Sequence, residues 1–167
     1  MGGRCTAVTS GEFIMAIETP LMRTRFSVRL LLLTCSLGLG LSTAARASDY
    51  ASAISAYRHA HGLPKVRLDS RLSAVALKQA QAMAVTGSIS HSAAGSFEFR
   101  VASLRKSRAA ENIGAGYISF SEMLRQWEDS AGHRQNLLMS GARSVGVASV
   151  ANARSPYRKF WAMVITD

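Results

Sequence analysis

The sequence is poor in cysteine and acidic residues and has no long hydrophobic run, and each shortage excludes a class of protein. Two cysteines among 167 residues do not make a disulfide-rich scaffold. The longest apolar stretch, near residues 30–41, has about 12 residues, whereas a bilayer crossing needs about 20, so a multi-pass membrane protein is excluded. Hydrophobic residues make up 48% and charged residues 18%, which excludes a disordered chain and a coiled coil.

The first 47 residues have the organisation of a secretory leader. A basic segment with three arginines precedes the apolar stretch, and the small-residue motif Ala45-Arg46-Ala47 follows it. This order predicts a signal peptide that is cleaved after Ala47, and Met22, just before the basic segment, is the predicted start. Two alternatives stay open: an uncleaved N-terminal membrane anchor, and a lipid attached at Cys35.

Residues 48–167 form the predicted exported domain of 120 residues, which keeps no cysteine and has no transmembrane span. The leader holds five of the 20 Lys+Arg and two of the 10 Asp+Glu, which leaves 15 and 8 and a net charge of about +7. The basic residues are scattered except at Arg105-Lys106-Ser107-Arg108, and no basic stripe with interleaved aromatics suggests nucleic acid as a partner. The cluster is either a solvated loop or a contact to an anionic cell envelope.

Apolar periodicity and capping residues predict helices first and a β-hairpin last, an α+β order. The first helix covers Tyr50–His61, and the second runs from a cap at Asp69 or Ser70 to about Val85, where Gly87 stops it. A loop over 88–110 holds a helical turn at Phe97–Leu104, and a third helix runs from Ser121 until Gly132, followed by a turn at Arg134–Leu138. The predicted strands are 145–150 and 160–165, joined by a loop over 152–159.

The candidate chemical groups are separated in the sequence. No H-E-x-x-H, C-x-x-C or Gly-rich phosphate loop occurs, so no element carries a complete metal or phosphate motif. His91 and His133 lie 42 residues apart, so a joint site depends on the fold. Ser130 precedes His133 by three residues and permits a nucleophile–base interpretation, although no orienting acid or oxyanion device is visible.

Several short strings occur in a characteristic order. They are Ser90-His91, Glu111-Asn112-Ile113, the string W-x-x-S-x-G-H-R-x-N-L-L from Trp127 to Leu138, Val145-Gly146-Val147, and Phe160-Trp161. This order resembles the bacterial, SCP-like extracellular branch of the CAP superfamily, which includes cysteine-rich secretory, antigen 5 and pathogenesis-related proteins. The long string is the most specific part, and the resemblance extends over residues 48–167.

The resemblance implies an α-β-α sandwich with a small antiparallel sheet between helical layers. It also implies a cavity with two histidines and acidic residues, which in some members binds a divalent metal such as zinc. By resemblance, His91, Glu111 and His133 carry over as cavity residues and as the metal ligands. The second cavity acid is undecided, because its usual position holds Ser130 here and Glu128 directly follows Trp127.

Each candidate also has a structural interpretation. His91 and Glu111 form either part of a zinc site or a structural pair in which the carboxylate accepts the ring N–H. His133 is either a cavity residue or a cation at the end of the third helix, where the helix dipole favours positive charge. Trp127 belongs to the core or to the cavity wall.

Three functions follow from these alternatives, and no catalytic residue is assigned. The first is an exported, non-enzymatic binding module whose partner is a lipid, a cell-wall component or another protein, in the periplasm or outside the cell. The second is a metal-dependent hydrolase of peptide or cell-wall substrates. The third treats the His/Glu set as a polar staple of the core without a ligand.

Overall fold

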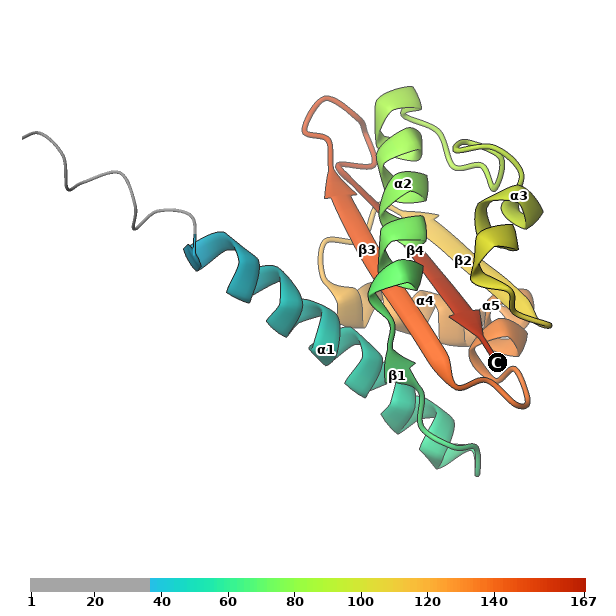
Figure 1. The fold of residues 1–167 in the computed structure, drawn as a ribbon. Helices are drawn as coiled ribbons and strands as arrows, with labels where there is room; N and C mark the ends of the chain where they lie inside the picture. Colours follow the sequence, from blue (N-terminus) through green and yellow to red (C-terminus); the bar gives the residue numbers. More distant parts are fainter. Residues whose placement is uncertain (1–36) are drawn as a thin grey trace, which may run out of the picture. The chain divides into compact units, whose positions relative to one another are not determined.

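The computed structural model describes residues 37–167, with side chains from residue 49 onward (Figure 1). The helices are α1 (Leu37–Ala60), α2 (Ser70–Thr86), α3 (Phe97–Val101), α4 (Phe120–Asp129) and α5 (Ala131–Leu137), and a 3-10 turn follows α3 at Ala102–Leu104. The strands are β1 (Arg67–Leu68), β2 (Ala109–Ala115), β3 (Ser144–Ala151) and β4 (Lys159–Thr166). None of the helices in this part of the chain has the length and apolar content of a membrane span.

The first helix is longer than its sequence pattern indicates. It continues to Ala60 as predicted but begins at Leu37, so the predicted cleavage position after Ala47 lies within one continuous helix. Met22, Cys35 and the basic segment of the leader lie outside the described residues. Cleavage after Ala47 stays a prediction.

The four strands form one mixed sheet in the order β1-β3-β4-β2. The three long strands are antiparallel, whereas β1 pairs in parallel with β3 through Arg67 opposite Ser144. The two hairpin strands are as predicted, but β1 and β2 were not anticipated from the sequence. Strand β4 lies between β3 and β2, and all of its residues from Phe160 to Thr166 are buried.

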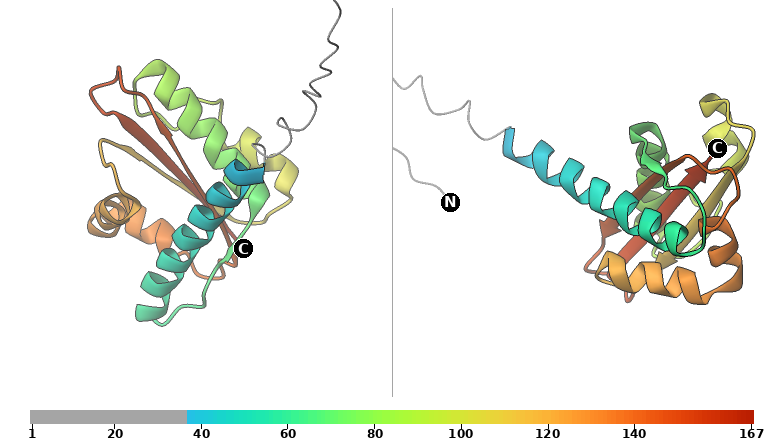
Figure 2. Two further views of the ribbon diagram at one scale, coloured as in Figure 1. Left: turned by 90° about the vertical axis from the view of Figure 1, so that its left-hand side faces the viewer. Right: turned by 90° about the horizontal axis from the view of Figure 1, so that it is seen from below.

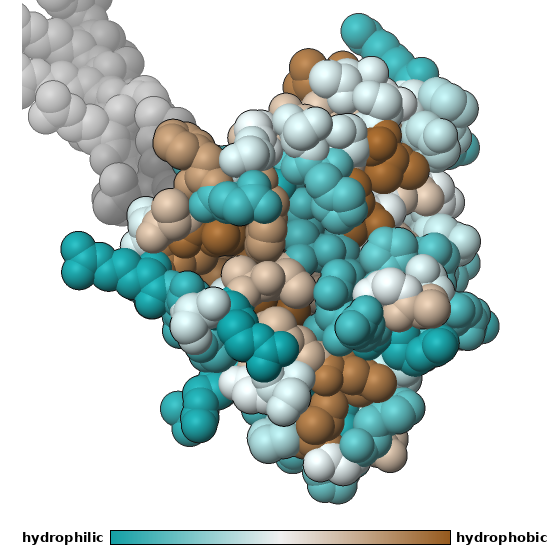
Figure 3. All heavy atoms as spheres, turned by 90° about the vertical axis from the view of Figure 1, so that its right-hand side faces the viewer, coloured by the Kyte–Doolittle hydropathy of each residue, from teal (hydrophilic) through white to brown (hydrophobic). Residues whose placement is uncertain are grey.

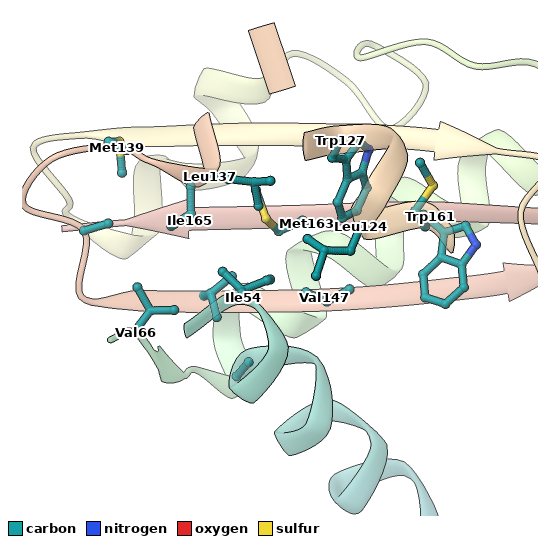
Figure 4. Close-up of a cluster of buried hydrophobic side chains, with 14 residues drawn as sticks. Ile54, Val66, Leu124, Trp127, Leu137, Met139, Val147, Trp161, Met163 and Ile165 are labelled. Carbon is teal, nitrogen blue, oxygen red and sulfur yellow. The ribbon is translucent and has the colours of Figure 1, made fainter. Parts of the chain in front are cut away.

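Successive side chains of β4 point to opposite faces of the sheet and belong to two hydrophobic cores. Trp161, Met163 and Ile165 pack against α1, α4 and α5, as the close-up in Figure 4 shows. Phe160, Ala162 and Val164 pack on the opposite face against α2. Figure 2 shows the sheet between these helical layers. The predicted sandwich is therefore confirmed, and its sheet is mixed rather than wholly antiparallel.

Helix α2 has the ends that its sequence predicts. The carboxylate of Asp69 accepts the backbone N–H groups of Arg71 and Leu72 at 2.8 and 3.2 Å. At the other end Gly87 adopts a left-handed φ of 69° and donates its N–H to Met83. These caps satisfy backbone groups that a helix leaves unpaired, and they fix α2 against the sheet.

The segment predicted as one helix to Gly132 is two helices. Helix α4 starts with a capping box in which Ser119 and Glu122 bond reciprocally, and it ends at Asp129. Ser130 has extended backbone angles, and α5 begins directly after it. His133 therefore lies in the first turn of α5, and its interpretation as a cation at a helix C-terminus is wrong.

Candidate functional site

Glu111 is the buried centre of the candidate site. It projects from β2, the edge strand beside β4, and its side chain is only 2% exposed. The Nδ1 atom of His91 lies 2.9 Å from its Oε1 atom, and the His91 side chain is 59% exposed. One imidazole thus reaches from the surface to a buried carboxylate, the contact that both sequence interpretations require.

Gln79 holds the loop that carries His91. Its buried side chain donates through Nε2 to the Ser90 carbonyl at 2.6 Å and accepts the Ala94 N–H at 3.3 Å. The loop between α2 and α3 is therefore fixed to the middle of α2 on both sides of His91. A buried amide that is satisfied in this way places the imidazole precisely.

Arg100 of α3 is the third member of the site, and the sequence analysis did not identify it. Its Nη1 donates to Glu111 Oε2 at 2.6 Å and its Nη2 donates to Oε1 at 3.0 Å. Nη2 also donates to the His91 carbonyl at 2.9 Å, and the Arg100 side chain is 5% exposed. This two-pronged, buried ion pair is the strongest type of carboxylate contact, so Glu111 has a fixed cationic partner within the chain.

His133 approaches from α5. Its Nδ1 atom is buried and has no hydrogen-bond partner, which is uncommon for a buried ring nitrogen. Burial lowers the pKa of His133 below its ordinary value of 6.5, and the proximity of His91 lowers it further. Both effects favour the neutral form of His133.

Two asparagines attach α5 to β2 beneath the site. Asn136 donates to the Glu111 carbonyl at 3.2 Å and to Asn112 Oδ1 at 2.9 Å. Asn112, which is fully buried, donates to the His133 carbonyl at 3.0 Å. Residues of two of the family strings, Glu111-Asn112 and Asn136, are therefore in contact. These contacts fix the main chain at His133 relative to β2.

The predicted metal ligands fit zinc only in part. Arg100 and His91 already use three of the roughly four acceptor positions of the Glu111 carboxylate and Arg100 pairs its charge, so Glu111 fits poorly as a direct ligand. The partnerless Nδ1 of His133 fits, and His91, which uses Nδ1 toward Glu111, has its other ring nitrogen left for a cation. Among the described residues no group of three or more His, Cys, Asp or Glu side chains is arranged to hold a metal ion.

The other predicted cavity residues lie away from Glu111. Trp127 is fully buried in the core that α4 forms with the sheet, where its Nε1 donates to the Ile113 carbonyl at 3.2 Å. Burial and the adjacent Asp129 raise the pKa of Glu128, whereas the charges of Arg125 and His61 act to lower it.

Ser130 lines a separate hollow of about 510 Å³ with residues of α4 and with Tyr117. Its carbonyl accepts the Arg134 N–H, and its hydroxyl makes no capping hydrogen bond. His91, Glu111 and Arg100 do not line this hollow. The geometry thus offers no support for a Ser130–His133 nucleophile and base.

The surface beside α3 is chemically mixed. Hydrophilic side chains cover most of the face shown in Figure 3, and apolar side chains form separate patches among them. On α3, Phe99 is 82% exposed, while Arg100 turns inward and passes 5.4 Å from the centre of the Phe97 ring. The exposed side chains of this region thus include the His91 imidazole and the Phe99 ring.

The sandwich fold carries a buried glutamate, Glu111, that the exposed imidazole of His91 contacts. The family model described as the Cysteine-rich secretory protein family (CAP) matches residues 51–165. The chain belongs to this family. Among curated proteins, none matches the chain significantly.

Solved structures share the fold at low sequence identity. An extracellular protein with an SCP domain from Bacillus anthracis has 24% identity and a TM-score of 0.63, and the match covers 74% of this chain and 40% of that one. An outer surface protein of Borrelia burgdorferi has 18% identity and a TM-score of 0.62, with 71% and 89% covered. A cysteine-rich secretory protein of Staphylococcus aureus has 16% identity and a TM-score of 0.56, with 71% and 36% covered. The chain therefore spans well under half of the first and third relatives.

Proposed function

We propose that this CAP-domain protein is exported and acts as a non-enzymatic binding module at the cell envelope or outside the cell. The ligand contacts the exposed imidazole of His91 and the aromatic surface of α3. The ligand class is a lipid, a cell-wall component or another protein.

The observation that carries this proposal is that the Glu111 carboxylate is already hydrogen-bonded to Arg100 and His91. A general base needs a lone pair that can accept a proton from a substrate or water. Here Oε2 accepts from Arg100 at 2.6 Å, and Oε1 accepts from Arg100 and is bonded to His91. Three of the roughly four acceptor positions of the carboxylate are thus used and its charge is paired, which supports a site that presents His91 over one that uses Glu111 as a base.

The exported location rests on the leader pattern and on the relatives. The basic, apolar and small-residue segments occur in the order of a signal peptide. The three structural relatives are an extracellular protein, an outer surface protein and a cysteine-rich secretory protein. The positive net charge of about +7 on residues 48–167 also suits an anionic envelope.

A metal-dependent hydrolase is the second candidate, and the buried, partnerless Nδ1 atom of His133 favours it. His133 and His91 would hold the ion, and a bound zinc would supply Lewis acidity at the site. Glu111 would then orient His91 through the 2.9 Å contact instead of binding metal itself.

Calorimetric titration of zinc into the metal-free full chain separates the two candidates when it is combined with an assay on peptide and cell-wall substrates. The binding module predicts no zinc-dependent turnover, and it predicts sedimentation with isolated envelopes that weakens in His91→Ala. A matched control is His59→Ala, an exposed histidine on α1. Zinc binding at one site with turnover that is lost in His133→Ala would replace the binding module with the hydrolase.

A further inference from the structure

A cationic hollow of about 490 Å³ lies where β1, the start of β3 and the end of β4 meet. Its lining includes Lys65, Arg67, Lys106 and Arg143, and one acidic residue, Asp167. None of the lining residues belongs to the His91, Glu111 and His133 site. The hollow therefore stands independently of the function proposed above.

Main-chain pairing brings two of the arginines together. The Arg67 N–H donates to the Arg143 carbonyl at 2.8 Å, and the Arg143 N–H donates to the Thr166 carbonyl at 2.8 Å. The parallel pairing of β1 with β3 thus places Arg67 next to Arg143, the residue that precedes β3, and both line the hollow. This short strand, which the sequence did not indicate, builds one wall of the hollow.

Among the side chains that the structure describes, three of the four cations have no acidic partner. Within residues 49–167, no carboxylate lies within 4.0 Å of Lys65, Arg67 or Arg143. Like charges gathered around a concave surface repel one another and concentrate a positive potential. A bound anion would reduce that repulsion, so the arrangement favours anion binding.

Asp167, the acidic residue of the lining, holds residues 107 and 108 to the end of β4 through hydrogen bonds. The side chain of Asp167 accepts from the Ser107 hydroxyl and from the Arg108 N–H, and these hydrogen bonds hold the pKa of its carboxyl below the ordinary value. Lys106 donates to the main-chain oxygen of Asp167 at 2.7 Å. The Arg108 guanidinium donates to the Ser140 carbonyl at 3.1 Å. The basic cluster singled out in the sequence is thereby fastened beside the hollow.

We propose that this hollow binds a phosphate group. Two guanidinium groups can each donate two parallel hydrogen bonds to phosphate oxygens, and lysine adds a compact charge. A volume of about 490 Å³ exceeds the space for one phosphate and admits the sugar or glycerol of a phosphate ester. The shared chemistry is a phosphate monoester or diester, carried either by a soluble compound or by an anionic lipid headgroup.

Nuclear magnetic resonance titration of the full chain with inorganic phosphate tests the site. Amide signals of residues 65–67 and 141–144 should shift and saturate in the wild type, and the dissociation constant should rise at least about tenfold in Arg67→Gln/Arg143→Gln. Both arginines are exposed, so the melting temperature reports whether the variant folds. Arg67→Lys/Arg143→Lys keeps the charge but loses the forked donors and should bind with intermediate affinity.

Arg154→Gln/Arg158→Gln is the matched control, because it removes the same charge from exposed positions on the β3–β4 loop. It should change the dissociation constant less than twofold. Equal losses in the two double variants, or no saturating shift with phosphate, would overturn the proposal. Cosedimentation with phosphatidylglycerol vesicles, against phosphatidylcholine vesicles, then assigns the source: binding that depends on Arg67 and Arg143 identifies a lipid headgroup, and its absence identifies a soluble phosphate ester.

Discussion

Arg100 and Glu111, which lie 11 residues apart in the sequence, form a buried two-pronged ion pair with N–O distances of 2.6 and 3.0 Å. The guanidinium is 5% and the carboxylate 2% exposed, so neither charge can rely on water. The pair ties α3 to the edge strand β2 and holds the acid that His91 contacts. The chemistry of the candidate site therefore depends on a residue outside the family strings recognised in the sequence.

Arg100→Ala should lower the free energy of unfolding by about 3–5 kcal/mol, because it leaves the Glu111 carboxylate buried without its cation. Urea unfolding at neutral pH measures the change. Arg100→Met/Glu111→Leu removes both charges and should recover most of this loss. A double variant as unstable as Arg100→Ala would contradict the ion-pair argument, since no uncompensated charge remains in it.

Gly146→Ala should also destabilise the protein, through a steric conflict. A Cβ atom at Gly146 of β3 would lie 2.1 Å from the Ser73 nitrogen and 2.3 Å from the Leu72 carbonyl carbon, both in the backbone of α2. The helix must then move off the sheet, at a cost of about 3 kcal/mol or more. Gly132→Ala in α5 is the control, because its Cβ meets nothing within 4 Å and helical alanine is favoured. Thermal unfolding of both variants should show opposite shifts.

Local signals account for the elements that the sequence predicted. The Asp69 cap, the Gly87 stop and the apolar face between them determine α2 without help from the rest of the chain. Strand β2 has no such signal, because Ala109–Ala115 contains one β-branched residue and places a charge and an amide at its centre. Its pairing with β4 and the partners of Glu111 and Asn112 supply what local propensity lacks.

The candidate site was predictable only as far as the family strings reach. His91, Glu111 and His133 carry over by resemblance, and the structure places His91 Nδ1 2.9 Å from Glu111 Oε1. The role of Arg100 depends on the angle at which α3 meets β2, which no spacing rule encodes. The roles of Asn112 and Asn136 likewise depend on tertiary contacts between α5 and β2.

Arg58, which counts as one of many scattered basic residues in the sequence, is completely buried. Its guanidinium donates to the carbonyls of Leu137, Met139 and Pro64 at 2.7, 3.1 and 3.0 Å and thereby ties α1 to the end of α5. Arg58→Met should cost about 3 kcal/mol of unfolding free energy, because buried carbonyls lose their donors. Arg125→Met, at an exposed arginine of α4, should stay within about 0.5 kcal/mol of the wild type in the same denaturation experiment.

The protonation of His133 should make stability depend on pH. Burial and His91 lower its pKa in the folded state, so the unfolded chain takes up a proton more readily near the ordinary value of 6.5. The unfolded state then binds more protons than the folded state, and the free energy of unfolding falls as the pH drops below about 6.5 and levels off below the folded-state pKa. His133→Gln should flatten this slope between about pH 7 and pH 5, measured with a chelator present, whereas His59→Gln at an exposed position should keep it. An unchanged slope in His133→Gln would mean that the partly buried imidazole of His133 does not control the acid sensitivity of the fold.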